Sequence, residues 1–152
     1  MLKDEAIRYI KSENKYGNKK ALYHYNCAET LLYSSNDYFE LGLDSKTLKM
    51  IVPFGGGFYS ESTCGALTGG VAAIGAIFAE DKPTNNEKLK EVTKKWVEVF
   101  EKEFGSLDCK DIKPIHRDEV KGCEPVMVRA AELLESIINE YSKGKKRDKS
   151  KI

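Results

Sequence analysis

The segment 63–79 constrains the fold of this chain most, because it belongs to the longest stretch without a charged side chain. Its sequence is TCGALTGGVAAIGAIFA, in which five of the 17 residues are alanine and four are glycine. A membrane-spanning helix usually needs about 20 predominantly apolar residues, so we expect a buried helix here and no membrane association. A helix that is apolar all round is normally covered by neighbours on every side, which predicts the centre of a helical domain.

One face of this expected helix carries almost no side chain, since Gly65 and Gly69 align at helical spacing with Ala72 and Ala76. Each glycine costs a helix about 1 kcal/mol relative to alanine. Close approach of neighbouring helix backbones would offset that cost. We therefore expect other helices to pack directly against this face.

Helical spacing of apolar residues predicts the remaining elements. The expected helices cover residues 4–12, 19–34, 44–51, the central segment from a cap at Ser60 or Ser62 to about Ala79, residues 87–104, and a last helix from Cys123-Glu124-Pro125 onward. Asp44 is a typical N-cap and Gly105 a typical C-terminal glycine. No segment alternates with a period of two. The predicted fold is all-α, a compact helical bundle of about five to six helices around a small-residue central helix.

Two segments are predicted to be irregular. Ser106 should cap a short turn that carries Cys109, and a polar loop with Pro114 and a solvated His116 should follow. Residues 1–142 are expected to form a single four-cysteine helical domain. The basic tail 143–152, KGKKRDKSKI, is expected to be disordered.

Composition limits the partners and the compartment. The 152 residues suit one domain, and a net charge of +1 provides no general field for nucleic acid or anionic lipid. The start, MLKDEAIRYIK, has no apolar stretch of a secretory signal, so we expect a cytoplasmic protein. Structural disulfides are rare in the cytosol. Four cysteines then favour metal binding or thiol chemistry, against the alternative of separately buried thiols.

The four cysteines lack metal-ribbon or thioredoxin spacing, because no CxxC pair occurs among Cys27, Cys64, Cys109 and Cys123. Their position relative to helices is more informative. The last three fall at or just before expected helix N-termini, and Asn26-Cys27-Ala28-Glu29 resembles a capping box. Helix N-termini favour a thiolate over a thiol. We therefore expect the four thiols to converge on one site.

Several motifs occur together in one order. They are Asn26-Cys27-Ala28-Glu29, the glycine run before Ser62-Thr63-Cys64-Gly65-Ala66, Cys109 after Phe104-Gly105-Ser106, and Cys123 before Ala130-Ala131-Glu132-Leu133-Leu134. Over residues 21–138 the chain resembles the redox-active family named for its C-GCAxxG-C-C pattern, which is related to the non-haem domain of split-Soret cytochromes. Thr63 and Gly65 stand where the family name has Gly and Ala, and His24 stands where a smaller residue is expected. These departures concern local packing rather than the cysteine set.

The resemblance implies a redox role in which Cys27, Cys64, Cys109 and Cys123 are the catalytic, cofactor-binding or metal-ligating residues. The split-Soret relatives imply an iron–sulfur cluster, whereas selenoprotein members imply thiol chemistry. No CxxCH sequence is present, so no c-type haem is expected.

Three functions stay open. The first is an electron-transfer protein with an iron–sulfur cluster, since four thiolates are a standard ligand set. The second is a dithiol/disulfide oxidoreductase or redox sensor, in which Cys109 and Cys123 are closest in sequence. The third is a helical interaction module with structural zinc. A redox partner protein and a homodimer are further expectations.

Two neighbouring features have alternative interpretations. His24 lies three residues before Cys27, where it could lower the thiol pKa, replace a ligand or simply pack. The run Gly55-Gly56-Gly57 could cradle an anion, but no Walker lysine follows it. A role in shaping the backbone around Cys64 is the preferred interpretation.

Overall fold

The fold is a bundle of seven α-helices, described for residues 1–149 by a computed structural model, with side chains considered up to residue 143. The helices are α1 (Leu2–Lys11), α2 (Cys27–Tyr38), α3 (Ser45–Lys49), α4 (Gly65–Phe78), α5 (Glu87–Phe104), α6 (Cys109–His116) and α7 (Glu124–Lys149). The other helical segments are the 3₁₀ segments η1 (Ser12–Tyr23) and η2 (Val52–Phe54) and the π-helical turn η3 (Gly57–Glu61). The described residues form no strand, only isolated bridges. The all-α prediction is confirmed, with one helix more than the expected upper number.

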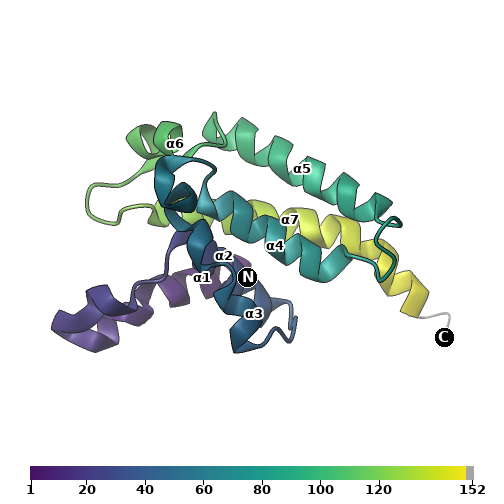
Figure 1. Cartoon of the computed structure of the whole chain (residues 1–152), viewed down its shortest axis with the longest axis horizontal. Coiled ribbons are helices and arrows are strands. Elements are labelled where there is room, and N and C mark those ends of the chain that lie inside the picture. Colours follow the sequence, from purple (N-terminus) through teal and green to yellow (C-terminus); the bar gives the residue numbers. More distant parts are fainter. Residues whose placement is uncertain (150–152) are drawn as a thin grey trace.

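Helix α4 is central, as predicted, because it contacts α2, α5 and α7 (Figure 1). A Cβ atom on Gly69 would lie 2.5 Å from the carbonyl oxygen of Ala28 in α2. A Cβ atom on Gly70 would lie 2.8 Å from the indole ring of Trp96 in α5. The glycines therefore permit the close helix approach that their cost in helix propensity implied.

One face of α4 is nevertheless open, so the expectation of cover on every side is wrong. Ala76 is exposed and Gly75 has nothing within 4 Å of its ideal Cβ position. An apolar pocket of about 370 Å³ lies along this face and is also lined by residues of α2 and α3. The predicted cap is wrong too, since Cys64 rather than Ser60 or Ser62 is the N-cap of α4.

The chain between α1 and α2 differs most from expectation. Only the second part of the predicted helix 19–34 forms, because His24 has an extended backbone that separates η1 from α2. Helix α2 begins only at Cys27. No residue of η1 is buried, and Leu22 is 79% exposed. Without a buried face, the apolar spacing of this segment does not produce a regular α-helix.

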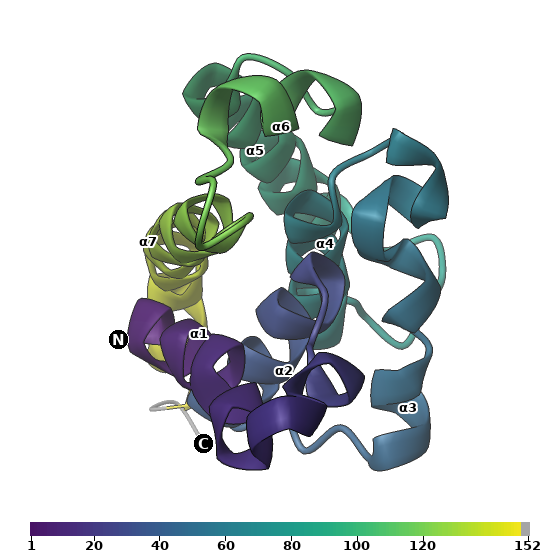
Figure 2. The same cartoon turned by 90° about the vertical axis from the view of Figure 1, so that its left-hand side faces the viewer.

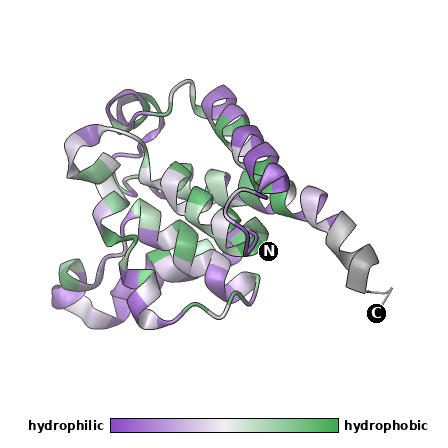
Figure 3. Ribbon diagram, turned by 45° about the vertical axis from the view of Figure 1, so that its right-hand side comes forward, coloured by the Kyte–Doolittle hydropathy of each residue, from purple (hydrophilic) through white to green (hydrophobic). Residues whose placement is uncertain are grey.

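Helix α5 has the predicted bounds and the predicted amphipathic character. Its inner residues Val92, Trp96 and Phe100 are fully buried, and Gly105 ends it with a left-handed φ of 78°. The Trp96 indole donates a hydrogen bond to the Leu67 carbonyl of α4 at 3.0 Å. Figure 3 shows the contrast between its hydrophilic outer face and the apolar α4.

The segment after Gly105 forms a helix where a turn and a polar loop were predicted. Pro114 lies within α6, and the Ile112 side chain of this helix belongs to the core with 2% exposure. His116 is in the same helix, and its Nε2 lies 3.2 Å from the Phe104 carbonyl oxygen, so the prediction of a solvated loop histidine is wrong. Burial of Ile112 stabilises the helix despite the hydrogen bond that proline cannot donate.

Helix α7 starts after Cys123 as predicted and packs against α1, α4 and α5. Its backbone stays helical to Lys149, which lies inside the basic segment 143–152. Residues 150–152 lie outside the described residues, so disorder of the tail stays a prediction. Within the described part, none of the helices combines the length and the apolar character needed to cross a bilayer.

Candidate functional site

The four predicted cysteines line one small cavity of about 30 Å³. Cys27 is the first residue of α2, Cys64 the N-cap of α4, Cys109 the first residue of α6, and Cys123 the residue before α7. The starts of these helices gather at one end of the molecule, on the left in Figure 1 and facing the viewer in Figure 2. The expected convergence of the thiols is therefore present in the fold.

Backbone hydrogen bonds bring Cys64 and Cys109 together. The Cys64 amide donates to the Leu107 carbonyl at 2.7 Å, and the Cys109 amide donates to the Ser62 carbonyl at 2.6 Å. Between them, Thr63 and Asp108 form an isolated antiparallel bridge. Both thiols are buried, with 5% and 6% exposure. This pair forms a rigid inner wall of the cavity.

Cys27 reaches the cavity because α2 begins at a capping box. The Asn26 side chain accepts a hydrogen bond from the Glu29 amide at 2.9 Å, and the Asn26 amide donates to the Glu29 carboxylate at 3.1 Å. The Asn26 side-chain amide also donates to the Val52 carbonyl at 3.0 Å. A Cβ atom on Gly65 would lie only 3.2 Å from that of Cys27. The capping box and this glycine together let Cys27 approach the start of α4.

The glycine run shapes the chain before Cys64, as the sequence indicated. Gly56 lines the cavity, and an ideal Cβ on Gly55 would lie 2.2 Å from the Asn26 side chain. The backbone is left-handed at Gly56 and Gly57, and it stays left-handed at Phe58 and Tyr59, whose φ angles are 61° and 56°. Such conformations cost non-glycine residues on the order of 1–3 kcal/mol each. A strained loop therefore leads directly into the site.

Cys27 and Cys123 form an unequal pair. The neighbouring Cys27 thiol and the positive charges of Arg117 and Lys113 together lower the pKa of Cys123 to about 6, against the effect of burial. The adjacent Cys123 thiolate, together with burial, raises the pKa of Cys27 well above its ordinary value. Near neutral pH the pair therefore consists of a Cys123 thiolate and a Cys27 thiol.

The thiols of Cys64 and Cys109, on the inner wall of the cavity, have raised pKa values. Burial raises the pKa of Cys64 to about 11, although backbone N–H groups of Ala66 and Leu67 oppose the change. Burial also raises the pKa of Cys109, and Lys113 opposes it. The prediction that each helix N-terminus favours a thiolate is therefore wrong for these two. Desolvation outweighs the field of a helix terminus at a buried sulfur.

His24 does not lie one helical turn from Cys27, since the chain between them is extended. Its Nδ1 lies 2.6 Å from a Glu13 carboxylate oxygen. The histidine still acts on the site through space, because it favours the Cys123 thiolate electrostatically. A position on the same helical face as Cys27 was the wrong expectation.

Lys113 and Arg117 are the site residues that the sequence interpretation missed. Lys113 is the charged residue that lines the thiol cavity, one helical turn after Cys109. Arg117 is the C-cap of α6 and favours the Cys123 thiolate. Lys113 follows Cys109 by four residues, a spacing that places both residues on one face of a helix. The sequence interpretation missed Lys113 because it predicted a turn and a loop for this segment.

The cavity fits metal groups only in part. Four thiols match the donors of an iron–sulfur cluster or a zinc site in number and kind. A volume of about 30 Å³ holds only about one or two water molecules. Within the described part of the chain, no three His, Cys, Asp or Glu side chains are arranged to hold a metal ion. Thiol chemistry is possible in the geometry as it stands, whereas a metal centre needs the cavity walls to move.

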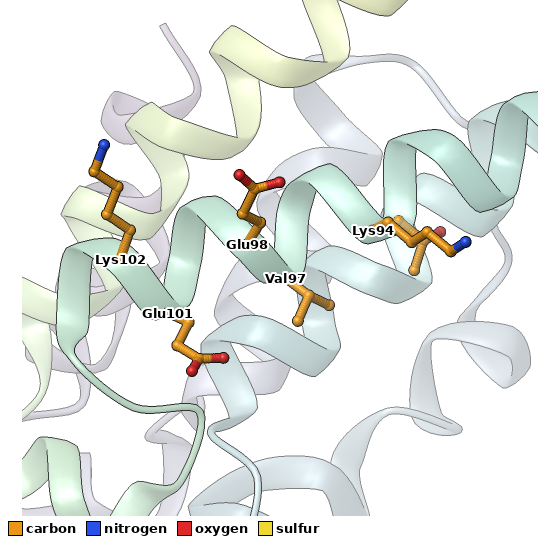
Figure 4. A pocket seen from close by; sticks show the side chains of 6 residues that line it. Lys94, Val97, Glu98, Glu101 and Lys102 are labelled. Carbon is orange, nitrogen blue, oxygen red and sulfur yellow. The ribbon is translucent and has the colours of Figure 1, made fainter.

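A larger hollow of about 630 Å³ on the outside of α5 has no such convergence (Figure 4). Its side chains all come from one helix: Thr93, Lys94, Val97, Glu98, Glu101 and Lys102. Acidic and basic groups are interspersed along this surface, and no second element forms a wall. We interpret it as the solvated face of an amphipathic helix.

Comparison with known proteins agrees with the geometry. No curated protein and no solved structure matches the chain. One family model matches residues 25–137, and its description is putative redox-active protein (C_GCAxxG_C_C). The match includes all four cysteines and covers most of the chain. The chain therefore belongs to the C_GCAxxG_C_C family of redox-active proteins.

Proposed function

We propose that this protein is a dithiol/disulfide redox protein in which Cys27 and Cys123 form a reversible disulfide. The observation that carries the proposal is that Cys27 and Cys123 both line the inner cavity and both line the open cleft beside it. The pair differs from Cys109 and Cys123, which are closest in sequence. Disulfide exchange needs a thiolate nucleophile beside a second thiol, and this pair supplies both.

Access also favours this pair. Cys27 and Cys123 line an open cleft of about 660 Å³ in addition to the inner cavity. Cys64 and Cys109 line the inner cavity but not this cleft. Reactive cysteines have a lowered pKa and are accessible, whereas buried thiols are inert. We therefore assign the attack on a partner disulfide to Cys123 and the second, resolving step to Cys27.

A redox titration of the thiols tests this assignment. Protein purified without oxygen is equilibrated with dithiothreitol at increasing ratios of its oxidised to its reduced form, and free thiols are counted at each ratio. We expect wild type to lose one pair of thiols reversibly and Cys27→Ser to lose none. Cys64→Ser is the matched control and should behave like wild type. Unchanged thiol numbers in wild type, or equal loss in Cys27→Ser, would overturn the proposal.

The iron–sulfur cluster is a second proposal, favoured by the four thiols around one cavity. When bound, such a cluster would supply one-electron transfer, with Cys27, Cys64, Cys109 and Cys123 as the residues that hold it. The same anaerobic preparation tests it by iron and sulfide analysis and by its visible spectrum. Stoichiometric iron and sulfide that are lost in Cys64→Ser would favour the cluster over the dithiol. Zinc in their place would indicate a structural metal.

A further inference from the structure

The cleft outside Cys27 and Cys123 contains more charged groups than the inner cavity. Its walls are formed by η1, by the end of α6, by the connection to α7 and by the start of α7. These elements lie at the end of the molecule that faces the viewer in Figure 2. Its basic residues are Lys11, His24, Lys113, Arg117 and Lys121, and its acidic residues are Glu13, Glu119 and Glu124. A volume of about 660 Å³ lies in the range that small-molecule sites occupy.

Part of this charge is neutralised within the protein. His24 pairs with Glu13 at 2.6 Å, and Lys113 pairs with Glu61, which lies outside the cleft, at a longer 3.5 Å. Arg117 forms no ion pair with any residue that the structure describes. Its guanidinium is therefore available to a ligand.

Two cations of the cleft, Arg117 and Lys113, act on the Cys123 sulfur, because both favour its thiolate. Lys113 is the charged residue that lines both the cleft and the inner cavity. The Arg117 side chain lies over Gly122, with its Nε 3.9 Å from the ideal Cβ position of that residue. Gly122 precedes Cys123 directly in the chain. A ligand sulfur at Cys123 would thus have two cationic groups within reach of its substituents.

We propose that the cleft binds a small disulfide that carries a carboxylate near its sulfur atoms, with Arg117 and Lys113 binding the carboxylate. This inference rests on the proposed function of Cys27 and Cys123. Arginine suits the role because its planar guanidinium binds carboxylates with two hydrogen bonds. Lys113 adds a point charge on the side of the cavity.

The reaction balances with the substrate as the oxidant. The Cys123 thiolate attacks one sulfur of the substrate disulfide, which forms a mixed disulfide and releases the other half as a thiolate. The Cys27 sulfur then attacks Cys123, its proton goes to the second departing thiolate, and the Cys27–Cys123 disulfide forms. The substrate gains the two electrons that the pair loses. A dithiol reductant returns the pair to its starting state by the reverse exchange.

Three small disulfides of different charge test the inference. Anaerobic, reduced protein is mixed with dithiodipropionate, which is anionic, with hydroxyethyl disulfide, which is neutral, and with cystamine, which is cationic. The measured quantity is the rate at which the Cys27–Cys123 disulfide forms. We expect wild type to react about 10-fold faster with the anionic than with the neutral compound, and slowest with cystamine.

Variants at Arg117 separate binding from reactivity. Arg117→Gln should reduce the ratio of the anionic to the neutral rate to about 1, and Arg117→Lys should restore part of it. Lys46→Gln, on exposed α3, is the control and should keep the wild-type ratio. The ratio is used because Arg117 also favours the Cys123 thiolate, which affects all three rates equally.

The outcomes separate the two proposals. Equal rates with the anionic and neutral compounds in wild type, or an unchanged ratio in Arg117→Gln, would overturn the substrate class while the pair still oxidises. If none of the three compounds links Cys27 to Cys123, the proposed dithiol function itself fails.

Discussion

The two cysteine pairs at the cavity are held in different ways. Backbone hydrogen bonds fix Cys64 and Cys109, whereas Cys27 and Cys123 come from the starts of two different helices and meet at the cleft. Both pairs sit at helix N-termini, yet only Cys123 has a lowered pKa. A helix terminus contributes roughly 0.3–1 kcal/mol, which is less than the desolvation of a buried thiolate. A neighbouring thiol and nearby cations therefore decide which thiol is reactive.

The largest expected difference between the pairs is in alkylation by iodoacetamide. At pH 7 the thiolate of Cys123, with a pKa of about 6, should react at least on the order of 10-fold faster than Cys64, with a pKa of about 11, after allowing for lower intrinsic nucleophilicity. Peptide mass spectrometry after short labelling measures the two rates. Cys27→Ser should slow the labelling of Cys123, whereas Cys109→Ser should not. Equal labelling rates of Cys123 and Cys64 would contradict the predicted difference in reactivity between the two cysteine pairs.

The next effect concerns the packing that holds both pairs at one cavity. Gly69→Leu places a side chain against the Ala28 backbone and should lower the free energy of unfolding by roughly 1–3 kcal/mol. Gly75→Ala is the matched change on the open face of the same helix and should stabilise by up to about 1 kcal/mol. Urea unfolding of both variants measures the difference. Equal effects would mean that α2 and α4 are not closely packed.

A smaller effect is expected at the helix starts that carry the cysteines. Asn26→Ala removes the cap of α2 and should cost about 1 kcal/mol. Asp108, the N-cap of α6, makes no side-chain capping bond, so Asp108→Ala should change the stability by less than about 0.5 kcal/mol. Thermal unfolding with calorimetry compares them. A larger cost at Asp108 would contradict the description of the two starts.

The smallest expected effect is on how the free energy of unfolding changes with pH, because solvent screens the charge of the half-buried Cys123. In the folded protein its pKa is lowered from 9.0 to about 6, so between these values the unfolded chain binds more protons. The stability of wild type relative to Cys123→Ser should rise from pH 6 to pH 9 and be lost as pH falls through 6.

Cys64 gives the opposite pH dependence and serves as the control. Its pKa is raised to about 11, so its contribution to stability is present below pH 9 and is lost as pH rises from 9 to 11. Urea unfolding at several pH values measures both. A rise between pH 6 and pH 9 that persists in Cys123→Ser must come from other groups.

Features that depend on neighbouring residues could be predicted from the sequence. The Asn26 capping box, the Asp44 cap, the bounds of α5 and its end at Gly105 all follow from local chemistry. The central position of α4 followed from its apolar character. The shared position of the cysteines at helix N-termini also predicted that they meet.

Features that depend on distant contacts could not be predicted. The apolar spacing of residues 19–34 suggested one helix, but Leu22 is 79% exposed and the α-helix begins only at Cys27. Pro114 suggested a loop, but burial of Ile112 stabilises α6 around it. Sequence separation suggested Cys109 as the partner of Cys123, whereas the packing of α2 against α4 and α7 also brings Cys27 to the cleft that Cys123 lines. Pairing at a site is a tertiary property.

Mapping of the disulfide in oxidised wild type tests the central claim most directly. Anaerobically purified protein is oxidised with a small disulfide, remaining thiols are alkylated, and the linked peptides are identified by mass spectrometry. The account predicts a link between Cys27 and Cys123, reversed by dithiothreitol, with Cys64 and Cys109 recovered in alkylated form after unfolding. A link between Cys109 and Cys123, or between Cys64 and Cys109, as the main product would contradict it.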